Sequence, residues 1–221
     1  LIRQEAVRVQ RKNGASIITT QDGKTIRAAK VLLANGAYAN HILERKLDLR
    51  PKAVSVVLAE VGKAEQKRLQ DLPTLIWRLE NHPVLASIYS VPPTAYPDGR
   101  VYFKIGGTLR TPVYIYKPEE FLAHFHSPGN AHEIAALSEV LLDLLPGLKV
   151  DSWQSRPCVV TYTAHEYPYI DQADEGTFVA VGGCGSAAKS SDELGRIAAI
   201  LAEKGDWQYD VGAQTFHANW L

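Results

Sequence analysis

The strongest hydrophobic pattern in the chain lies near its C-terminal end, in residues 158–205. The β-branched and aromatic run 177–181 predicts a short buried strand, which leads directly into the glycine-rich segment 182–189. A helix is predicted to begin at Ser190, with Glu193 at the capping-box spacing, and to end at Gly205. Its apolar face comprises Leu194, Ile197, Ala198 and Leu201.

A strand that passes through glycines into a helix suggests a binding site. The first amides of a helix lack intrahelical partners, and the helix dipole is positive at that end. Lys189 adds a full positive charge next to the predicted helix start. This segment is therefore expected to hold an electron-rich group.

The N-terminal region, residues 7–34, has the alternating pattern of a β-meander. Asn13-Gly14 and Asp22-Gly23 are turn signals between its strands. The continuous apolar run 31–34 predicts a strand buried on both faces, ending at Asn35-Gly36. Such an ending is a common place for a ligand to meet the backbone, although a simple turn explains it equally well.

Residues 50–155 have a different pattern, typical of a mixed sheet with peripheral helices. Strands are expected at 53–61, 75–79, 84–91 and 101–107, with a turn-rich loop at 92–100. Helices are expected at 63–72 and from the Asn130 cap to Pro146-Gly147. The predicted class is therefore α/β (α+β), with domain segments 1–49, 50–155 and 156–205 followed by the tail 206–221.

Composition excludes several classes of protein. Among the 221 residues, 24 basic and 24 acidic side chains cancel, so no nucleic-acid or anionic-membrane partner is expected. No apolar run approaches the roughly 20 residues of a membrane span. Two cysteines form no disulfide framework, which favours a reducing, cytoplasmic location. The absence of methionine, even at position 1, leads us to expect a piece of a longer protein.

The order of these segments resembles the D-amino-acid-oxidase-like flavoenzymes, most closely the monomeric sarcosine oxidase and N-methyl amino acid oxidase branch. The similar segments are VLLANGAYAN at 31–40, the mixed β region, RPCVVTYTAHEYPYID at 156–171 and the glycine loop with its lysine. The similarity runs over residues 1–205 and corresponds to the later part of that family. It implies part of an FAD-binding Rossmann-like domain with an inserted mixed-sheet substrate domain.

The resemblance implies specific FAD contacts in the N-terminal region and at a cysteine. Ala34, Gly36 and Tyr38 match the segment that closes part of the FAD site, and Val7 matches a position whose backbone lies by the adenine. Cys158, 13 residues before Asp171, matches a cysteine that carries a covalent flavin link. A thiolate can add to an electrophilic flavin carbon, and Arg156 is a neighbour that could favour the thiolate. The alternative is an inert cysteine packed in a strand.

The glycine loop matches the family pattern Gly-x-x-Gly-x-Gly-x-Lys, with one departure. Ala187 replaces the last glycine, so the backbone at that position must avoid positive φ. By resemblance the loop amides face the flavin pyrimidine edge and Lys189 holds the substrate carboxylate; a solvated lysine is the alternative. The expected loop contacts to the flavin come from Gly182, Gly183, Cys184, Gly185, Ser186, Ala187 and Lys189.

Lys104 completes the expected catalytic residues. It resembles the lysine over the flavin face that favours reaction with oxygen, although an edge lysine pointing to water is a common alternative. Thr108 replaces a histidine of the sarcosine oxidases, so sarcosine is not the expected substrate. The resemblance thus implies FAD, O2 and a small amine or amino acid substrate whose C–N bond is oxidised. The dinucleotide motif G-x-G-x-x-G is expected upstream of Leu1.

Two other functions stay open at this point. Gly183-x4-Ala188-Lys189-Ser190 nearly matches a phosphate-binding loop of a nucleotide-binding protein, with alanine in place of its second glycine. A non-catalytic assembly module is the other alternative. The histidines show no metal-site spacing beyond His124-x-His126, and no metal is expected. His165 falls in the active-site strand turn of the resembled family, and the oligomeric state cannot be predicted.

Overall fold

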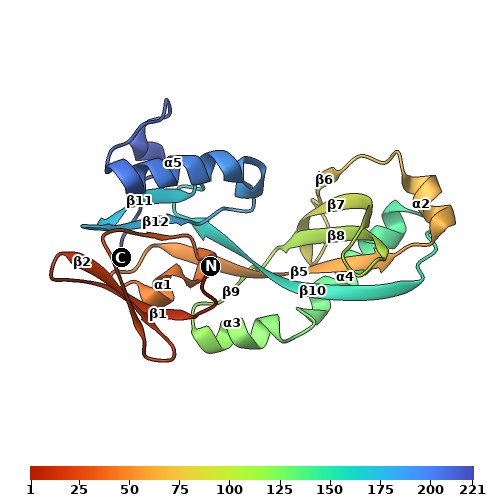
Figure 1. The fold of residues 1–221 in the computed structure, drawn as a ribbon. Helices are drawn as coiled ribbons and strands as arrows, with labels where there is room; N and C mark the ends of the chain where they lie inside the picture. Colours follow the sequence, from red (N-terminus) through yellow and green to blue (C-terminus); the bar gives the residue numbers. More distant parts are fainter. The chain divides into compact units, whose positions relative to one another are not determined.

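The computed structural model describes residues 1–221 and contains two compact units (Figure 1). The first unit comprises residues 1–51 and 160–221, and the second comprises residues 52–159. Strands β5 (Leu49–Glu60) and β10 (Ser152–Thr163) carry the chain from one unit into the other. The FAD-binding role expected for residues 1–49 and 156–205 and the substrate-binding role expected for residues 50–155 stay predictions. None of the helices is long and apolar enough to cross a membrane.

The first unit begins with the predicted meander. Strands β1 (Ala6–Lys12), β2 (Ala15–Thr20) and β3 (Thr25–Ala28) form an antiparallel sheet in that order. Asn13 and Gly14 both have positive φ, 49° and 71°, as a type I′ hairpin turn requires. Asparagine and glycine tolerate this backbone conformation best, which is why the turn could be predicted.

A second sheet in this unit has the order β11-β12-β4. Strand β11 (Tyr169–Asp174) is antiparallel to β12 (Thr177–Val181), whereas β4 (Val31–Leu33) runs parallel to β12. The prediction that both faces of β4 are buried is wrong for Leu32, which is 36% exposed. Its strand is the sheet's edge and pairs only with β12. Two short helices that were not predicted follow, η1 (Gly36–Tyr38) and α1 (Ala39–Ile42).

Helix α5 (Ser191–Lys204) packs against β11 and β12, and a 3-10 turn, η2 (Ala187–Ser190), precedes it. Gly205 ends the helix with φ 72°, as predicted. The capping-box prediction is wrong, because the Ser190 side chain makes no cap hydrogen bond. Ser190 ends the 3-10 turn with φ −130° and ψ 22°, so its backbone lacks the extended N-cap conformation. Glu193 instead forms a 2.6 Å ion pair with Arg196.

The C-terminal tail, whose role could not be predicted, is part of the first unit's core. After the short helix η3 (Ala213–Thr215), Phe216 and Ala218 are buried. The Ile170 amide donates to the Phe216 carbonyl at 2.8 Å, and the Ala218 amide donates to Asp171 Oδ2 at 2.8 Å. The tail is therefore held to β11 by one backbone hydrogen bond and by one to the Asp171 side chain, and it fills the space beside the strand.

The second unit contains a sheet with the order β10-β5-β8-β7-β6, and β9 pairs with β5. The pairs β5–β8, β5–β9, β6–β7 and β7–β8 are antiparallel, and the expected mixed character of the sheet stays a prediction. The loop predicted at 92–100 is shorter, since β7 continues to Ala95 through an irregularity between Val91 and Thr94. Prolines are tolerated in a strand at such bulges. The remaining strands are β6 (Leu75–Arg78), β7 (Leu85–Ala95), β8 (Val101–Leu109) and β9 (Val113–Tyr114).

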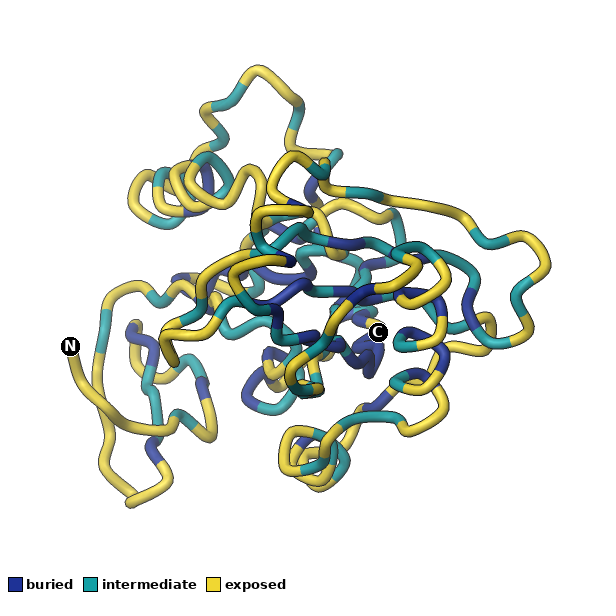
Figure 2. Tube along the Cα trace, turned by 90° about the vertical axis from the view of Figure 1, so that its right-hand side faces the viewer, coloured by how far each residue is buried: buried dark blue, intermediate teal, exposed yellow.

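Helix α4 (Ala131–Leu144) covers one face of this sheet. The Asn130 side chain accepts a hydrogen bond from the Glu133 amide, which confirms the predicted cap. Leu137 and Leu141 pack with Val57 and Ile105 in the unit's core. Figure 2 shows the buried positions concentrated in the middle of the chain trace. The other helices are α2 (Lys63–Leu69) and α3 (Pro118–Phe125), of which α3 was not predicted.

Glu133 should make the stability of the second unit depend on pH. Its carboxyl group is fully buried beside Ser55 and Lys52. Burial raises the pKa of Glu133 from its ordinary value of 4.5, more than Ser55 and Lys52 lower it. The folded state therefore holds this proton more tightly than the unfolded state, and the free energy of unfolding falls as pH rises from about 4.5 through the folded pKa.

We expect Glu133→Gln to remove this loss and to raise the free energy of unfolding by about 1–3 kcal/mol at about pH 8. Urea unfolding at about pH 5 and about pH 8 measures the effect. Glu139→Gln, an exposed position on the same helix, is the matched control. A variant with the same pH dependence as the wild type would contradict the expectation.

Candidate functional site

The site is organised by two parallel strands that end side by side. Strand β4 pairs with β12 in the register Val31↔Thr177 to Leu33↔Val179, so both carboxyl ends lie at the same edge of the sheet. Residues 34–36 follow one strand, and residues 182–189 follow the other. Ligands of α/β proteins bind preferentially at such carboxyl ends. The two segments singled out from the sequence are thus brought together.

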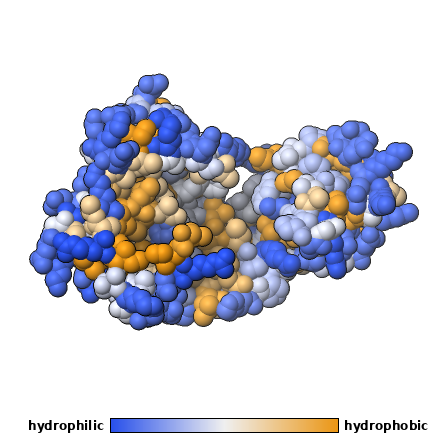
Figure 3. Space-filling model, in the orientation of Figure 1, coloured by the Kyte–Doolittle hydropathy of each residue, from blue (hydrophilic) through white to orange (hydrophobic).

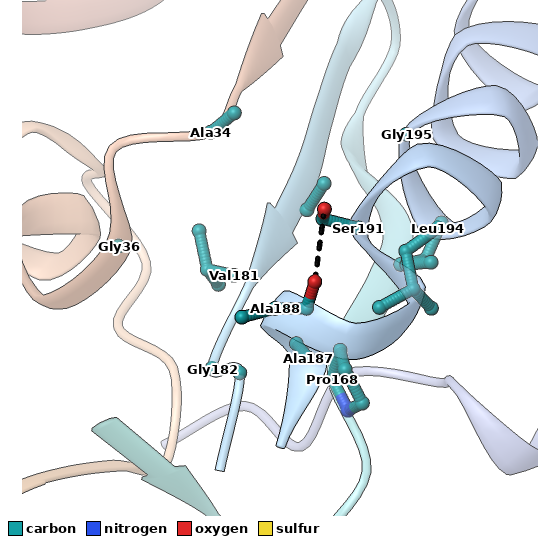
Figure 4. Close-up of a pocket in the computed structure, with 13 residues that line it drawn as sticks. Ala34, Gly36, Pro168, Val181, Gly182, Ala187, Ala188, Ser191, Leu194 and Gly195 are labelled. Carbon is teal, nitrogen blue, oxygen red and sulfur yellow. Dashed lines mark hydrogen bonds between the residues drawn. The ribbon is translucent and has the colours of Figure 1, made fainter. Parts of the chain in front are cut away.

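A cavity of about 320 Å³ lies between these two segments (Figure 4). In Figure 4, Ala34 and Gly36 line one side, Val181 and Gly182 lie at the end of β12, and α5 forms the opposite side. A hydrogen bond of 3.3 Å from Ser191 Oγ to the Ala188 carbonyl links η2 to α5. The full lining is Ala34, Gly36, Pro168, Ile170, Ala180, Val181, Gly182, Gly183, Ala187, Ala188, Ser191, Leu194 and Gly195.

A second cavity of about 500 Å³ shares the loop residues Gly183 and Ala187 with the first. Ser186 also lines it, and the tail contributes Tyr209 and Phe216. His165, which was of interest from its sequence position, lies in its wall and contacts the tail: its Nε2 is 2.9 Å from the His217 carbonyl oxygen. The loop thus has open space on two sides.

The backbone conformation of the loop explains why glycines occur in it. Gly182 and Gly185 have positive φ, 78° and 73°, and Cys184 also has φ 51°, which is unusual for a residue with a side chain. The Cys184 amide donates to the Thr161 carbonyl at 3.0 Å, which holds this conformation. Ala187 has negative φ, so the departure from the glycine pattern creates no strain there.

Unpaired polar groups of this region fit an electron-rich, hydrogen-bonding ligand. Gly183 lines both cavities, and its amide donates to no protein acceptor. Asn35 Oδ1, next to the lining residues Ala34 and Gly36, is buried without a hydrogen-bond partner. Buried polar groups are normally paired, so the Asn35 oxygen is an acceptor open to a ligand's donor, while the partly exposed Gly183 amide is a donor open to a ligand's acceptor. FAD, with its ring carbonyls, ring N–H and ribityl hydroxyls, meets this requirement.

Other expected FAD contacts of the first unit lie outside both cavity linings. Tyr38 is 41% exposed, and its ring contacts His41 edge-on at 5.6 Å between centroids. Val7 is 40% exposed on β1, and Figure 3 shows hydrophobic side chains gathered on the visible face of this unit. Cys184 and Gly185 shape the loop without lining a cavity. Lys189 is exposed on η2, and its side chain lines neither cavity.

The second unit contains the remaining two predicted residues, Cys158 and Lys104. Cys158 is exposed on β10, and its carbonyl oxygen is 3.0 Å from His124 Nε2. Arg156, expected to favour the thiolate, instead donates to Gln154 Oε1 at 2.7 Å and to the Ser155 carbonyl. Lys104 is half-buried on β8, which is a central strand, so the edge-strand alternative is wrong.

Several lining residues were not predicted from the sequence, among them Pro168, Ile170, Ser191 and Gly195. Gly195 could have been recognised in the sequence as a candidate site residue, because it is a glycine inside a predicted helix. A glycine inside a helix costs about 1 kcal/mol relative to alanine, so it often marks a close approach of another group. Pro168 and Ile170 reach the site only through the fold of the β10–β11 connection, and no local pattern indicates that.

Comparison with solved structures shows the same fold in larger enzymes. Fructosyl amine:oxygen oxidoreductase (amadoriase I) from Aspergillus fumigatus has 21% identity and a TM-score of 0.71, with 96% of this chain and 48% of that chain covered. Fructosamine oxidase (amadoriase II) from the same organism has 20% identity and a TM-score of 0.70, with 91% and 48% covered. Glycine oxidase from Geobacillus kaustophilus has 18% identity and a TM-score of 0.66, with 98% and 52% covered.

The chain thus spans about half the length of these solved structures. No curated protein sequence matches it. The family model described as FAD dependent oxidoreductase (DAO) matches residues 1–201, which include both strands and the glycine loop of the site. The chain therefore belongs to the DAO family of FAD-dependent oxidoreductases.

Proposed function

We propose that this chain forms part of an oxidase that acts on the C–N bond of a small amine or amino acid. The observation that carries the proposal is the cavity at the carboxyl ends of β4 and β12, lined by Ala34, Gly36 and the glycine loop. The similar solved structures support the substrate class, since they are fructosyl amine, fructosamine and glycine oxidases. The nearer likeness to the sarcosine oxidase branch stays a prediction.

When bound, FAD supplies the redox chemistry: a hydride leaves the substrate carbon, a proton leaves the nitrogen, and O2 finally takes both electrons and two protons to give hydrogen peroxide. The imine product then takes up water and hydrolyses. The proposed work of the protein is to bind, orient and stabilise charge. The unpaired Gly183 amide and the N-terminal end of α5 favour negative charge beside the loop.

Three side chains have proposed roles that follow the family resemblance. Lys189, a cation with no ion-pair partner, binds the substrate carboxylate. Lys104 places positive charge where oxygen is reduced, because superoxide-like charge develops in the first electron transfer. Cys158 is exposed, as a thiol must be to form a covalent bond to the flavin.

The phosphate-binding loop is the weaker alternative. Such a loop has a glycine directly before its lysine, but Ala188 stands at that position in this chain. The family assignment also supports a flavin cofactor over a nucleoside triphosphate ligand. The alternative of a non-catalytic assembly module does not explain the unpaired Gly183 amide and the buried, unpaired Asn35 oxygen.

Acid denaturation of the purified full-length protein tests the proposal. We expect yellow absorbance to remain with the wild-type polypeptide and to be released from Cys158→Ser, because serine cannot form the thioether. Cys184→Ser is the matched control and should retain the colour. Colour released from wild type would make the flavin non-covalent and leave Cys158 without a role in holding it. A native protein that stays colourless after incubation with FAD would overturn the proposed function.

A further inference from the structure

Tyr89 lies flat across a glycine on the face of the second unit's sheet that carries Lys104. In the β7–β8 register Tyr89 is opposite Gly106, and Val91 is opposite Lys104. A Cβ atom on Gly106 would lie 2.6 Å from both Cε1 and Cζ of the Tyr89 ring, closer than real Cβ contacts. The ring can occupy this place only because residue 106 has no side chain.

The Lys104 ammonium lies over this ring, with Nζ 5.5 Å from its centroid. This distance is within the range of about 6 Å in which a cation is attracted to an aromatic face. The cross-strand neighbours of Lys104 are Leu58 and Val91, which offer the ammonium no polar partner. Lys104 forms no ion pair with any carboxylate. The Tyr89 ring is therefore the group that attracts the ammonium.

The surroundings keep the Tyr89 ring neutral. Burial raises the pKa of the Tyr89 phenol, and negative charge at Cys158 would raise it further. The phenol thus stays protonated near neutral pH, and its attraction for Lys104 comes from the ring face. A change of the hydroxyl alone should accordingly leave the contact intact.

We propose that Tyr89 is the residue that positions Lys104. Gly106 makes room for the Tyr89 ring, and the ring holds the ammonium over the sheet face instead of letting the flexible side chain turn to solvent. The positioning follows from the contacts of this unit alone. Its consequence for catalysis, a faster reaction with oxygen, rests on the role proposed above for Lys104.

The positioning can be tested without flavin. An aromatic ring shields nuclei that lie over its face, so in protein labelled with ¹³C at the lysine ε-carbons we expect one upfield-shifted resonance, assigned by its disappearance in Lys104→Arg. Tyr89→Leu should abolish this shift and Tyr89→Phe should retain it. Gly106→Ala, which displaces the ring, should reduce it. Other lysine resonances report whether each variant is folded. A shift unchanged in folded Tyr89→Leu would overturn the proposal.

The consequence for catalysis is tested by measuring how fast the reduced full-length enzyme reacts with oxygen. Tyr89→Leu should slow this step by about 2- to 30-fold, in the same direction as Lys104→Met, while Tyr89→Phe restores it. Anaerobic reduction by substrate should change little. If Lys104→Met slows oxygen reaction and Tyr89→Leu does not, Tyr89 has no positioning role in catalysis. If Lys104→Met itself has no effect, the role proposed for Lys104 fails, while the resonance shift still decides the positioning.

Discussion

Replacement of Gly182 by alanine is expected to lower the free energy of unfolding of the first unit by about 2–5 kcal/mol. Two effects add at this position. Gly182 has φ 78°, where a side chain costs about 1–2 kcal/mol, and its Cβ would lie 2.4 Å from Thr163 Cγ2. Thr163 cannot turn away freely, because its hydroxyl donates to the Tyr167 carbonyl at 2.7 Å. Chemical denaturation of both proteins measures the difference.

Gly205 provides the matched control for this substitution. It has φ 72°, nearly the same as Gly182, but an added Cβ would have no atom within 4 Å. Gly205→Ala should therefore show only the conformational cost of about 1–2 kcal/mol. Equal losses at the two positions would mean that the contact with Thr163 is not tight. Gly182→Ala should also weaken FAD retention by the full-length protein, since the loop begins at this residue.

Local signals account for the parts of the fold that could be predicted. Asn13-Gly14 encodes its turn through backbone preference, and Asn130 caps α4 through its own side chain. Helix α3 carried a signal that was not used: Pro118 at its first position and two glutamates after it are typical of a helix start. The four-residue helix α1 has no amphipathic repeat, because it is barely longer than one turn.

The capping error at Ser190 shows the limit of local reasoning. Its spacing to Glu193 fits a capping box, yet the 3-10 turn before it sets its backbone, and Arg196 takes the glutamate. Arg156 is a second example of a competing partner: its guanidinium donates to Gln154, two residues away on the same strand. Sequence proximity indicates possible partners, but competing partners in the folded chain decide among them.

The glycine loop of the candidate site could be predicted because a strand, glycines and a helix start follow one another in sequence. Its pairing with residues 34–36 is different, since β4 and β12 are more than a hundred residues apart and only the family resemblance joined them. Lys104 and Tyr89 form a third case. Nothing in the sequence pairs them, because the contact depends on the β7–β8 register and on the missing side chain of Gly106.

Phe216→Ala is expected to have the other large effect, a loss of about 3–5 kcal/mol in the free energy of unfolding of the first unit. Phe216 is 7% exposed and packs with Ile170, Ile197 and Ala198, while Trp207 contacts its ring at 5.6 Å between centroids. Its carbonyl accepts the Ile170 amide, so the truncation leaves the backbone pairing but empties the space of the ring. Urea unfolding followed by circular dichroism measures this loss.

Val211→Ala is the matched control in the same tail, because Val211 is 43% exposed and should change stability by at most about 0.5 kcal/mol. The comparison also bears on the site, since Phe216 and the loop residues Gly183 and Ser186 line the same cavity. If the tail holds that cavity in shape, Phe216→Ala should weaken FAD retention by the full-length protein and Val211→Ala should not. Equal stability of the two variants would show that the tail is not anchored by Phe216.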